Sequence, residues 1–191
     1  VGGIAGAAFR SSTIQDCSSD LTVHSPTGTK VGGITGFLAG GSQLIRCANY
    51  GSVSAGHTSG SAGGIVGQVH GATINKITSC YNRGSIAAHG TGANAGGILG
   101  YCGNVGVAIT NCYNAAPVTS AYSEGAIISS YGSSGKITVG NSYFAQGYNG
   151  ATTAFRSSNY WSSSGGSGTV YSRSQYVMKS QSFANTLSSA D

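Results

Sequence analysis

Charged side chains, and acidic ones above all, are scarce in this sequence. Asp, Glu, Lys and Arg make up 7% of the 191 residues, and only four residues are acidic. The four acids form no pair at a spacing suited to glycoside hydrolysis, so a carboxylate-based hydrolase is not expected. The nine Lys and Arg residues never stand side by side, whereas nucleic-acid binding needs a clustered basic stripe. We therefore expect no nucleic-acid partner.

Long apolar runs, proline and catalytic motifs are also missing. No run of 18 apolar residues occurs, so no membrane span is expected. Two prolines beside 33 glycines, without a G-X-Y period, exclude collagen and argue against a Pro-rich linker. No zinc-type His motif, P-loop or nucleophile elbow is present, and His24, His57 and His89 lie in turn-like contexts typical of solvated loops. We expect no catalytic residue, metal or cofactor.

What the sequence does contain is a repeat of about 30 residues. Its clearest element is Gly-Gly-Ile-x-Gly, and the first glycines of successive copies are 30, 31, 33 and 29 residues apart, counting a degenerate fifth copy. The copies occupy residues 2–6, 32–36, 63–67, 96–100 and 125–129. Self-similarity at such a period is typical of solenoid architectures.

A second anchor keeps the same period. It is a cysteine column, with Ser142 in the fifth place: Cys17, Cys47, Cys80 and Cys112. Three residues before each anchor stands an aliphatic residue: Ile14, Leu44, Ile77, Ile109 and Val139. Two residues after three of the anchors stands an asparagine: Asn49, Asn82 and Asn114. Six residues after the first four anchors stands a β-branched residue: Val23, Val53, Ile86 and Val118.

Each repeat therefore holds three short apolar segments separated by Gly, Ser and Asn, a pattern typical of β-strands. We predict an all-β fold, a parallel β-solenoid (β-helix) over residues 1–154, with three strands per coil. The coils are expected to begin near residues 1, 31, 62, 95 and 124. Equivalent residues would then stack at ~4.8 Å per coil and share one core. Because Ile77 and Cys80 are three residues apart, a bend or bulge is expected between them.

The stacked columns have predictable roles. The cysteines fit small buried positions in a structural thiol ladder, although their distance alone leaves a disulfide open. Cys102 lies outside the ladder and is the candidate for a reactive thiol. The asparagines are either turn residues or members of a ladder bonded from rung to rung. In the column before the cysteines, Asp16 and Arg46 would stand on adjacent rungs, which predicts an ion pair.

The last part of the chain, residues 155–191, departs from the repeat. We predict a degenerate strand, a Gly/Ser loop over 162–169, and a short helix from Ser174 to Leu187 that caps the open end of the solenoid. A linker helix to a following domain is the other interpretation. No such cap precedes the first repeat, which predicts further repeats upstream.

Two segments carry a family resemblance. Gly63–Gly67 and the run Ile77 to Ile86 resemble GLUG-motif repeats, and the match recurs at Ile109–Asn114 and near Tyr176–Phe183. The first and fifth copies depart from the pattern. The resemblance implies a bacterial surface or secreted protein, because such repeats occur in large adhesins and in N-terminal regions of immunoglobulin-A-cleaving metallopeptidases. In those peptidases the catalytic motif lies elsewhere, and no family binding residue maps onto this chain.

These patterns predict a non-catalytic repeat module, extracellular or at the bacterial cell surface, that acts as an adhesin-like stalk or binding surface. The alternative is an accessory region of a secreted peptidase or glycan-degrading enzyme whose catalytic domain lies elsewhere. If the module binds a host glycan or an extracellular-matrix protein, the unequal loops 90–94 and 102–106 are candidate sites. Tyr101 and Tyr122 are the candidate ligand-binding residues.

Overall fold

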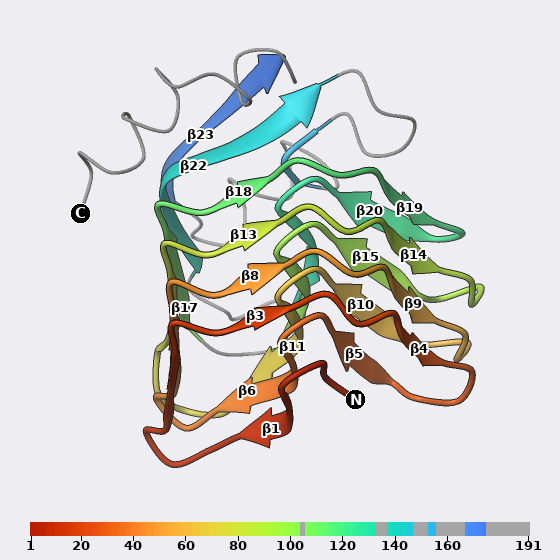
Figure 1. Ribbon diagram of the computed structural model, residues 1–191, viewed down its shortest axis with the longest axis horizontal. Helices are drawn as coiled ribbons and strands as arrows, with labels where there is room; N and C mark the ends of the chain where they lie inside the picture. The colour runs from red at the N-terminus through yellow and green to blue at the C-terminus, as the bar shows by residue number, and fades with distance from the viewer. Residues whose placement is uncertain (104–105, 133–136, 147–152, 156–166, 175–191) are drawn as a thin grey trace.

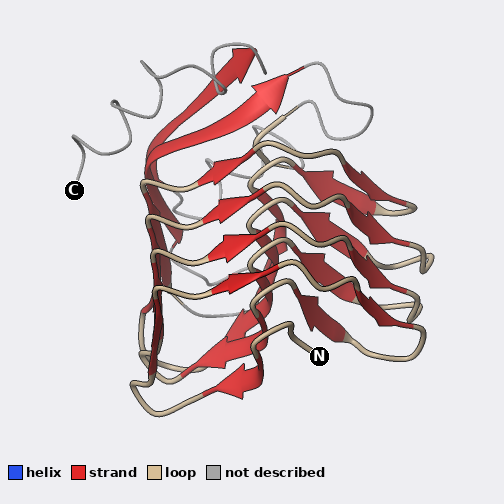
Figure 2. Ribbon diagram, in the orientation of Figure 1, coloured by secondary structure: helices blue, strands red, loops and turns tan. Residues whose placement is uncertain are grey.

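The computed structural model of the chain describes residues 1–103, 106–132, 137–146, 153–155 and 167–174. Within them every regular element is a β-strand, and the chain winds into a parallel β-solenoid of about five coils (Figures 1 and 2). The all-β solenoid expected from the repeat is confirmed. Each coil adds one layer to four sheets, which we number I to IV.

Sheets I and II are built from the strands on either side of each Gly-Gly pair. Sheet I contains β1 (Ala5–Ala8), β6 (Thr35–Ala39), β11 (Val66–His70), β16 (Leu99–Cys102) and β21 (Ile128–Tyr131). Sheet II contains β5 (Lys30–Gly32), β10 (Ser61–Gly63), β15 (Asn94–Gly96) and β20 (Ser123–Gly125).

Sheets III and IV hold the cysteine anchor and the β-branched column that follows it. Sheet III first runs through β2 (Thr13–Gln15), β7 (Gln43–Ile45), β12 (Asn75–Thr78), β17 (Val107–Thr110) and β22 (Ile137–Gln146). It continues through β18 (Tyr113–Asn114), β13 (Tyr81–Asn82), β8 (Ala48–Asn49) and β3 (Ser18–Ser19), with β23 (Ser167–Ser174) on β22. Sheet IV contains β4 (Val23–Ser25), β9 (Val53–Ala55), β14 (Ile86–Ala88) and β19 (Val118–Ser120).

The register places equivalent residues of successive coils directly over one another. In sheet III the paired Cα partners are Ile14 with Leu44, Leu44 with Ile77, Ile77 with Ile109 and Ile109 with Val139. In sheet IV, Val23, Val53, Ile86 and Val118 form one column in the same way. A repeat period of about 30 residues is thus one turn of the coil.

The coils contain more strands than the sequence pattern predicts, since the second coil runs from β5 to β9. The expectation of three strands per coil is wrong because each coil is divided at the Gly-Gly pair and again at a sharp bend before the anchor. The residue before each anchor adopts a left-handed conformation, with φ between 44° and 54°, which turns the chain between β12 and β13 and at the equivalent points. This is the bend expected between Ile77 and Cys80. The five bend residues are Asp16, Arg46, Ser79, Asn111 and Asn141.

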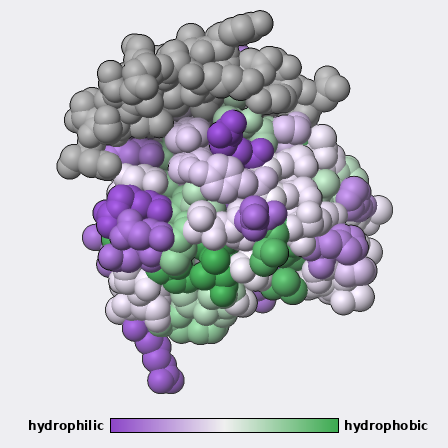
Figure 3. Space-filling model, viewed as in Figure 1, coloured by the Kyte–Doolittle hydropathy of each residue, from purple (hydrophilic) through white to green (hydrophobic). Residues whose placement is uncertain are grey.

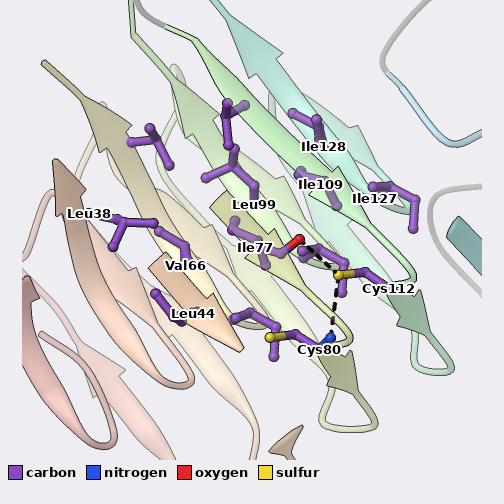
Figure 4. Close-up of a cluster of buried hydrophobic side chains, with 14 of the residues drawn as sticks. Leu38, Leu44, Val66, Ile77, Cys80, Leu99, Ile109, Cys112, Ile127 and Ile128 are labelled. Atoms are coloured by element: carbon purple, nitrogen blue, oxygen red, sulfur yellow. Dashed lines mark hydrogen bonds between the residues drawn. The ribbon is translucent and has the colours of Figure 1, made fainter. Parts of the chain in front are cut away.

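The interior is divided into two clusters of buried side chains. The larger lies between sheets I and III, and Figure 4 shows Val66 and Leu99 of sheet I beside Leu44 and Ile77 of sheet III. The smaller lies between sheets II and IV and is built mainly from Val and Ala. Each coil therefore has two lobes, which are joined where sheet I meets sheet II.

Burial within the solenoid depends on having a neighbouring coil. Ile34 is fully buried, whereas Ile4, its equivalent in the first coil, is 45% exposed. Val31 is likewise fully buried, while its equivalent Val1 is 54% exposed. A single coil does not cover its own apolar side chains, so stability comes from stacking.

The chain continues beyond the five coils with β23, which pairs in parallel with β22. The Gly/Ser loop predicted over 162–169 is therefore wrong for residues 167–169, which belong to this strand. The reason is that backbone hydrogen bonding to an open strand edge does not require apolar side chains. The predicted capping helix after Ser174 lies outside the described residues.

Candidate functional site

The cysteine column is held by hydrogen bonds within and between coils. The Sγ of Cys80 donates to the Thr78 carbonyl at 3.2 Å and accepts the backbone N–H of Cys47 at 3.4 Å. Cys112 repeats both bonds, and in the fifth coil the Ser142 hydroxyl accepts the Cys112 N–H at 3.3 Å. The anchor side chain thus satisfies backbone groups exposed by the bend. A small side chain with one donor and one acceptor suits this position, which explains why Ser replaces Cys.

The same environment makes the buried thiols unreactive. Hydrogen bonding to the next thiol, together with burial, raises the pKa of Cys47 and of Cys80 far above the ordinary value. All five cysteines are thiols, and Cys47, Cys80 and Cys112 are fully buried, whereas Cys17 in the end coil is partly exposed. A protonated buried thiol is neither a good nucleophile nor a good metal ligand.

Cys102 shares this character, although it lies in sheet I and outside the column. Its side chain is fully buried in the larger core, and burial raises its pKa to about 12. A thiolate is therefore rare at neutral pH, which argues against the reactivity considered for this residue.

The asparagine column forms a continuous buried ladder. Asn49 Nδ2 donates to Asn82 Oδ1 at 2.8 Å, and Asn82 Nδ2 donates to Asn114 Oδ1 at 2.7 Å. Each amide also bonds the backbone carbonyl two residues ahead, as Asn82 does with Gly84 at 2.8 Å. The two interpretations left open by the sequence, rung-to-rung ladder and turn residue, therefore both apply.

The Gly-Gly pairs are packed against neighbouring backbone, and in the second to fourth pairs the second glycine also contacts this ladder. A Cβ at Gly64 would overlap the Gly97 carbonyl and lie 2.5 Å from Asn82 Cγ. A Cβ at Gly63 would overlap the Val66 carbonyl. Gly64 is required because backbone and the Asn82 side chain pack directly on it, and Gly63 is required because the Val66 carbonyl does.

On the outer surface the bend column carries an ion pair. Arg46 Nε and Nη2 donate to the two carboxylate oxygens of Asp16 at 2.6 and 2.8 Å, and both side chains are more than half exposed. The predicted pair between adjacent rungs is confirmed. Hydrogen bonding from Arg46 holds the pKa of Asp16 below its ordinary value.

A tyrosine column runs along the outer face of β13 and β18. The rings of Tyr81 and Tyr113 stack with centroids 4.9 Å apart and planes 1° apart, and Tyr50 packs edge-on to Tyr81 with their hydroxyls bonded. Burial raises the pKa of Tyr113 to about 12. Figure 3, in the same view as Figure 1, shows a mostly pale surface with separate purple hydrophilic groups and a green hydrophobic patch. Because the ring faces of Tyr81 and Tyr113 cover one another, this column stabilises the stack, whereas the Tyr50 side chain is 45% exposed.

The two tyrosines singled out by the sequence lie in different places. Tyr101 stands in β16 on the outer side of sheet I, and Tyr122, 53% exposed, stands in the turn between β19 and β20. The loop at 90–94 joins β14 to β15, and residues 104–105 of the other candidate loop lie outside the described residues. Asn94, the last residue of the 90–94 segment, belongs to β15, and β15 directly precedes β16, the strand of Tyr101.

Tyr101 belongs to an outer column that faces a second one across the junction of sheets I and II, which we call the sheet corner. Lys30 Nζ of sheet II lies 4.9 Å from the ring centroid of Phe37 in sheet I. Both columns continue in register along the axis. By this register the equivalents of Lys30 and Phe37, always seven residues apart, are Ser61 and Gln68, Asn94 and Tyr101, and Ser123 and Ser130.

One polar atom of the corner is unsatisfied. The Oδ1 of Asn94 is buried and has no hydrogen-bond partner among the described residues. Sequence reasoning selected Tyr101 and the 90–94 segment that ends at Asn94, and it missed Lys30, Phe37 and Gln68. The available signal was the position directly after each Gly-Gly-Ile-x-Gly, which carries an aromatic ring in the second and fourth copies.

The described part of the chain contains neither a metal-binding cluster nor a membrane-spanning helix. No cluster of three or more His, Cys, Asp or Glu residues there could hold a metal ion. No helix long and apolar enough to cross a bilayer occurs in that part either. His57 and His89 lie between strands, whereas His24 is exposed but lies in β4, not in the loop expected from its sequence context.

Comparison with known proteins gives one informative likeness. No protein-family model and no curated protein matches the chain. The fold is similar to the crystal structure of a putative immunoglobulin A1 protease from Bacteroides ovatus, with a TM-score of 0.66 and 22% sequence identity. The match covers 94% of this chain and 53% of that one, so the chain spans about half of the similar protein. At this identity the likeness shows the fold alone.

Proposed function

We propose that this chain is a non-catalytic repeat module of a secreted or cell-surface bacterial protein. The observation that carries the proposal is that the polar side chains of the cysteine and asparagine columns form their hydrogen bonds within the protein itself. The thiols and the asparagine amides bond the backbone and the neighbouring rung, so their chemistry builds the stack. A body made of bonded layers suits a rigid spacer that presents its outer columns to partners.

Two further observations support a bacterial and extracellular location. The GLUG-like segments at 63–67 and 77–86 imply surface or secreted proteins, and the fold resembles a protein described as an immunoglobulin A1 protease. The low share of charged residues, with a surface of Ser, Thr, Asn and Gly, is in keeping with extracellular β-structure.

Localisation tests this proposal directly. Antibodies raised against purified residues 1–191 should label intact cells of the source organism, or detect the protein in its culture medium. An antibody against a cytosolic protein of the same cells should give signal only after permeabilisation. If the module behaves like that cytosolic control, the proposal is wrong.

The alternative function is an accessory region of a secreted peptidase or glycan-degrading enzyme. The observation that favours it is the similar structure, which is about twice as long as the matched region and carries a protease description. Removing residues 1–154 from the complete protein should then raise KM for a large substrate and leave kcat for a short one unchanged. Hydrolysis by the isolated chain would contradict both proposals.

A further inference from the structure

The sheet corner combines an aromatic ring, a cation and an unsatisfied acceptor along one line. Tyr101 and Phe37 stand two rungs apart in the same column, a separation of ~10 Å, with Gln68 between them. The opposite column supplies Lys30 at one end and Asn94 at the other. The spacing is comparable to the length of a disaccharide unit in an extended chain.

Each element has a preferred partner in a sugar. The Tyr101 side chain is partly exposed and offers an aromatic surface to the apolar face of a pyranose ring. A buried carbonyl oxygen without a donor is costly, so a sugar hydroxyl donating to Asn94 Oδ1 would remove that cost. Because this oxygen is covered in the free protein, neighbouring side chains must move aside for the hydroxyl.

The positive charge of the sheet corner favours sugars that carry a carboxylate. Lys30 is held over the Phe37 ring, and none of the eight residues that form the facing columns is acidic. The whole chain carries a formal charge of +5. An ammonium beside columns that carry no acid attracts a carboxylate, and its effect on association is reduced by salt.

We propose that the sheet corner binds an extended acidic polysaccharide, with one sugar packed on Tyr101 and bonded to Asn94 and a uronic-acid carboxylate paired with Lys30. The inference deepens the proposed function, because a module at the cell surface meets such polymers. It concerns a different surface from the tyrosine column of β13 and β18, whose ring faces are already stacked.

Isothermal titration calorimetry tests the proposal with purified residues 1–191. The probe is a hexasaccharide of alternating uronic acid and N-acetylhexosamine, and the matched ligand is its carboxyl-reduced, neutral form. The acidic form should bind more tightly, and the difference should shrink as salt is raised. Tyr101→Ala should weaken binding roughly tenfold or more, as loss of an aromatic anchor does.

Two further variants and one control complete the experiment. Asn94→Ala should weaken both hexasaccharides, and Lys30→Gln should abolish the preference for the acidic one. Lys76→Gln, which removes an exposed lysine of β12 in sheet III, should bind as the unaltered chain does, and all four variants should keep its thermal unfolding midpoint. The proposal is overturned if the folded chain binds neither hexasaccharide, or if Tyr101→Ala binds as tightly. Such a failure leaves the localisation test unaffected, so the two proposals fail separately.

Discussion

Removing the amide of Asn82 should unfold the solenoid at much lower denaturant concentration, because this side chain is the centre of the asparagine ladder. It is fully buried and takes part in four hydrogen bonds, with Asn49, Asn114 and both backbone groups of Gly84. At ~1 kcal/mol for each lost bond, Asn82→Ala should cost about 4 kcal/mol of unfolding free energy. This is a large part of the stability of an ordinary domain.

The assay is urea unfolding followed by far-ultraviolet circular dichroism. Asn94→Ala is the matched control, since its Oδ1 accepts no hydrogen bond from the described residues and the change should be neutral or slightly stabilising. Should Asn82→Ala lose less than ~1 kcal/mol, or no more than Asn94→Ala, the ladder would not be the stabilising feature we describe.

The opposite change extends the ladder by one rung. Asn49 Oδ1 is buried without a described partner, and the residue beneath it in the column is Ser19, which is too short to reach it. The Ser19 side chain packs against Gly3 as Asn49 packs against Gly33, so the site has the shape that an asparagine needs. Ser19→Asn should therefore stabilise the chain by about 1 kcal/mol in the same assay, and a loss of stability would count against the register at this end.

Two more predictions concern the glycines and the thiols. Gly64→Ala should destabilise by more than ~3 kcal/mol through overlap with backbone and Asn82, whereas Gly6→Ala, with open space around its Cβ, should be neutral in the same urea titration; equal effects would contradict the packing described. With iodoacetamide at pH 8, Cys17 should be alkylated rapidly in the folded chain, while the buried thiols, including Cys102 with its pKa raised to about 12, should react only after unfolding, as peptide mass spectrometry can show. Rapid labelling of Cys80 in the folded chain would be incompatible with the structure.

The columns were predictable because parallel stacking places the same demand on every coil. A position that is small and hydrogen-bonded in every coil, and buried in all but the first, selects Cys at 17, 47, 80 and 112, and Ser at 142. Because this requirement recurs once in every coil, the spacing of the anchor residues alone gives the register of the stacked strands.

Other features were hidden because the residues that create them share no side-chain type. The bend before the anchor uses a left-handed backbone conformation. Arg46 and Ser79 adopt this conformation as well as Asp and Asn residues, so no single residue type identifies the bend in the sequence. The sheet corner depends on a seven-residue offset between Lys30 and Phe37, and the later coils place Asn and Tyr at the same positions. The strand β23 pairs through its backbone, which a search for apolar alternation does not detect.

Site-directed cross-linking between coils tests the central claim, that residues about 30 positions apart stack directly over one another. Lys76 and Ala108 are Cα partners on the outer side of sheet III, within reach of a disulfide, whereas Thr110 is displaced from Lys76 by two residues, roughly 8 Å away. The account predicts that Lys76→Cys with Ala108→Cys closes a disulfide on mild oxidation, and that Lys76→Cys with Thr110→Cys does not. If the shifted pair cross-links as well as the aligned pair, or if neither does, the stacked columns do not exist as described.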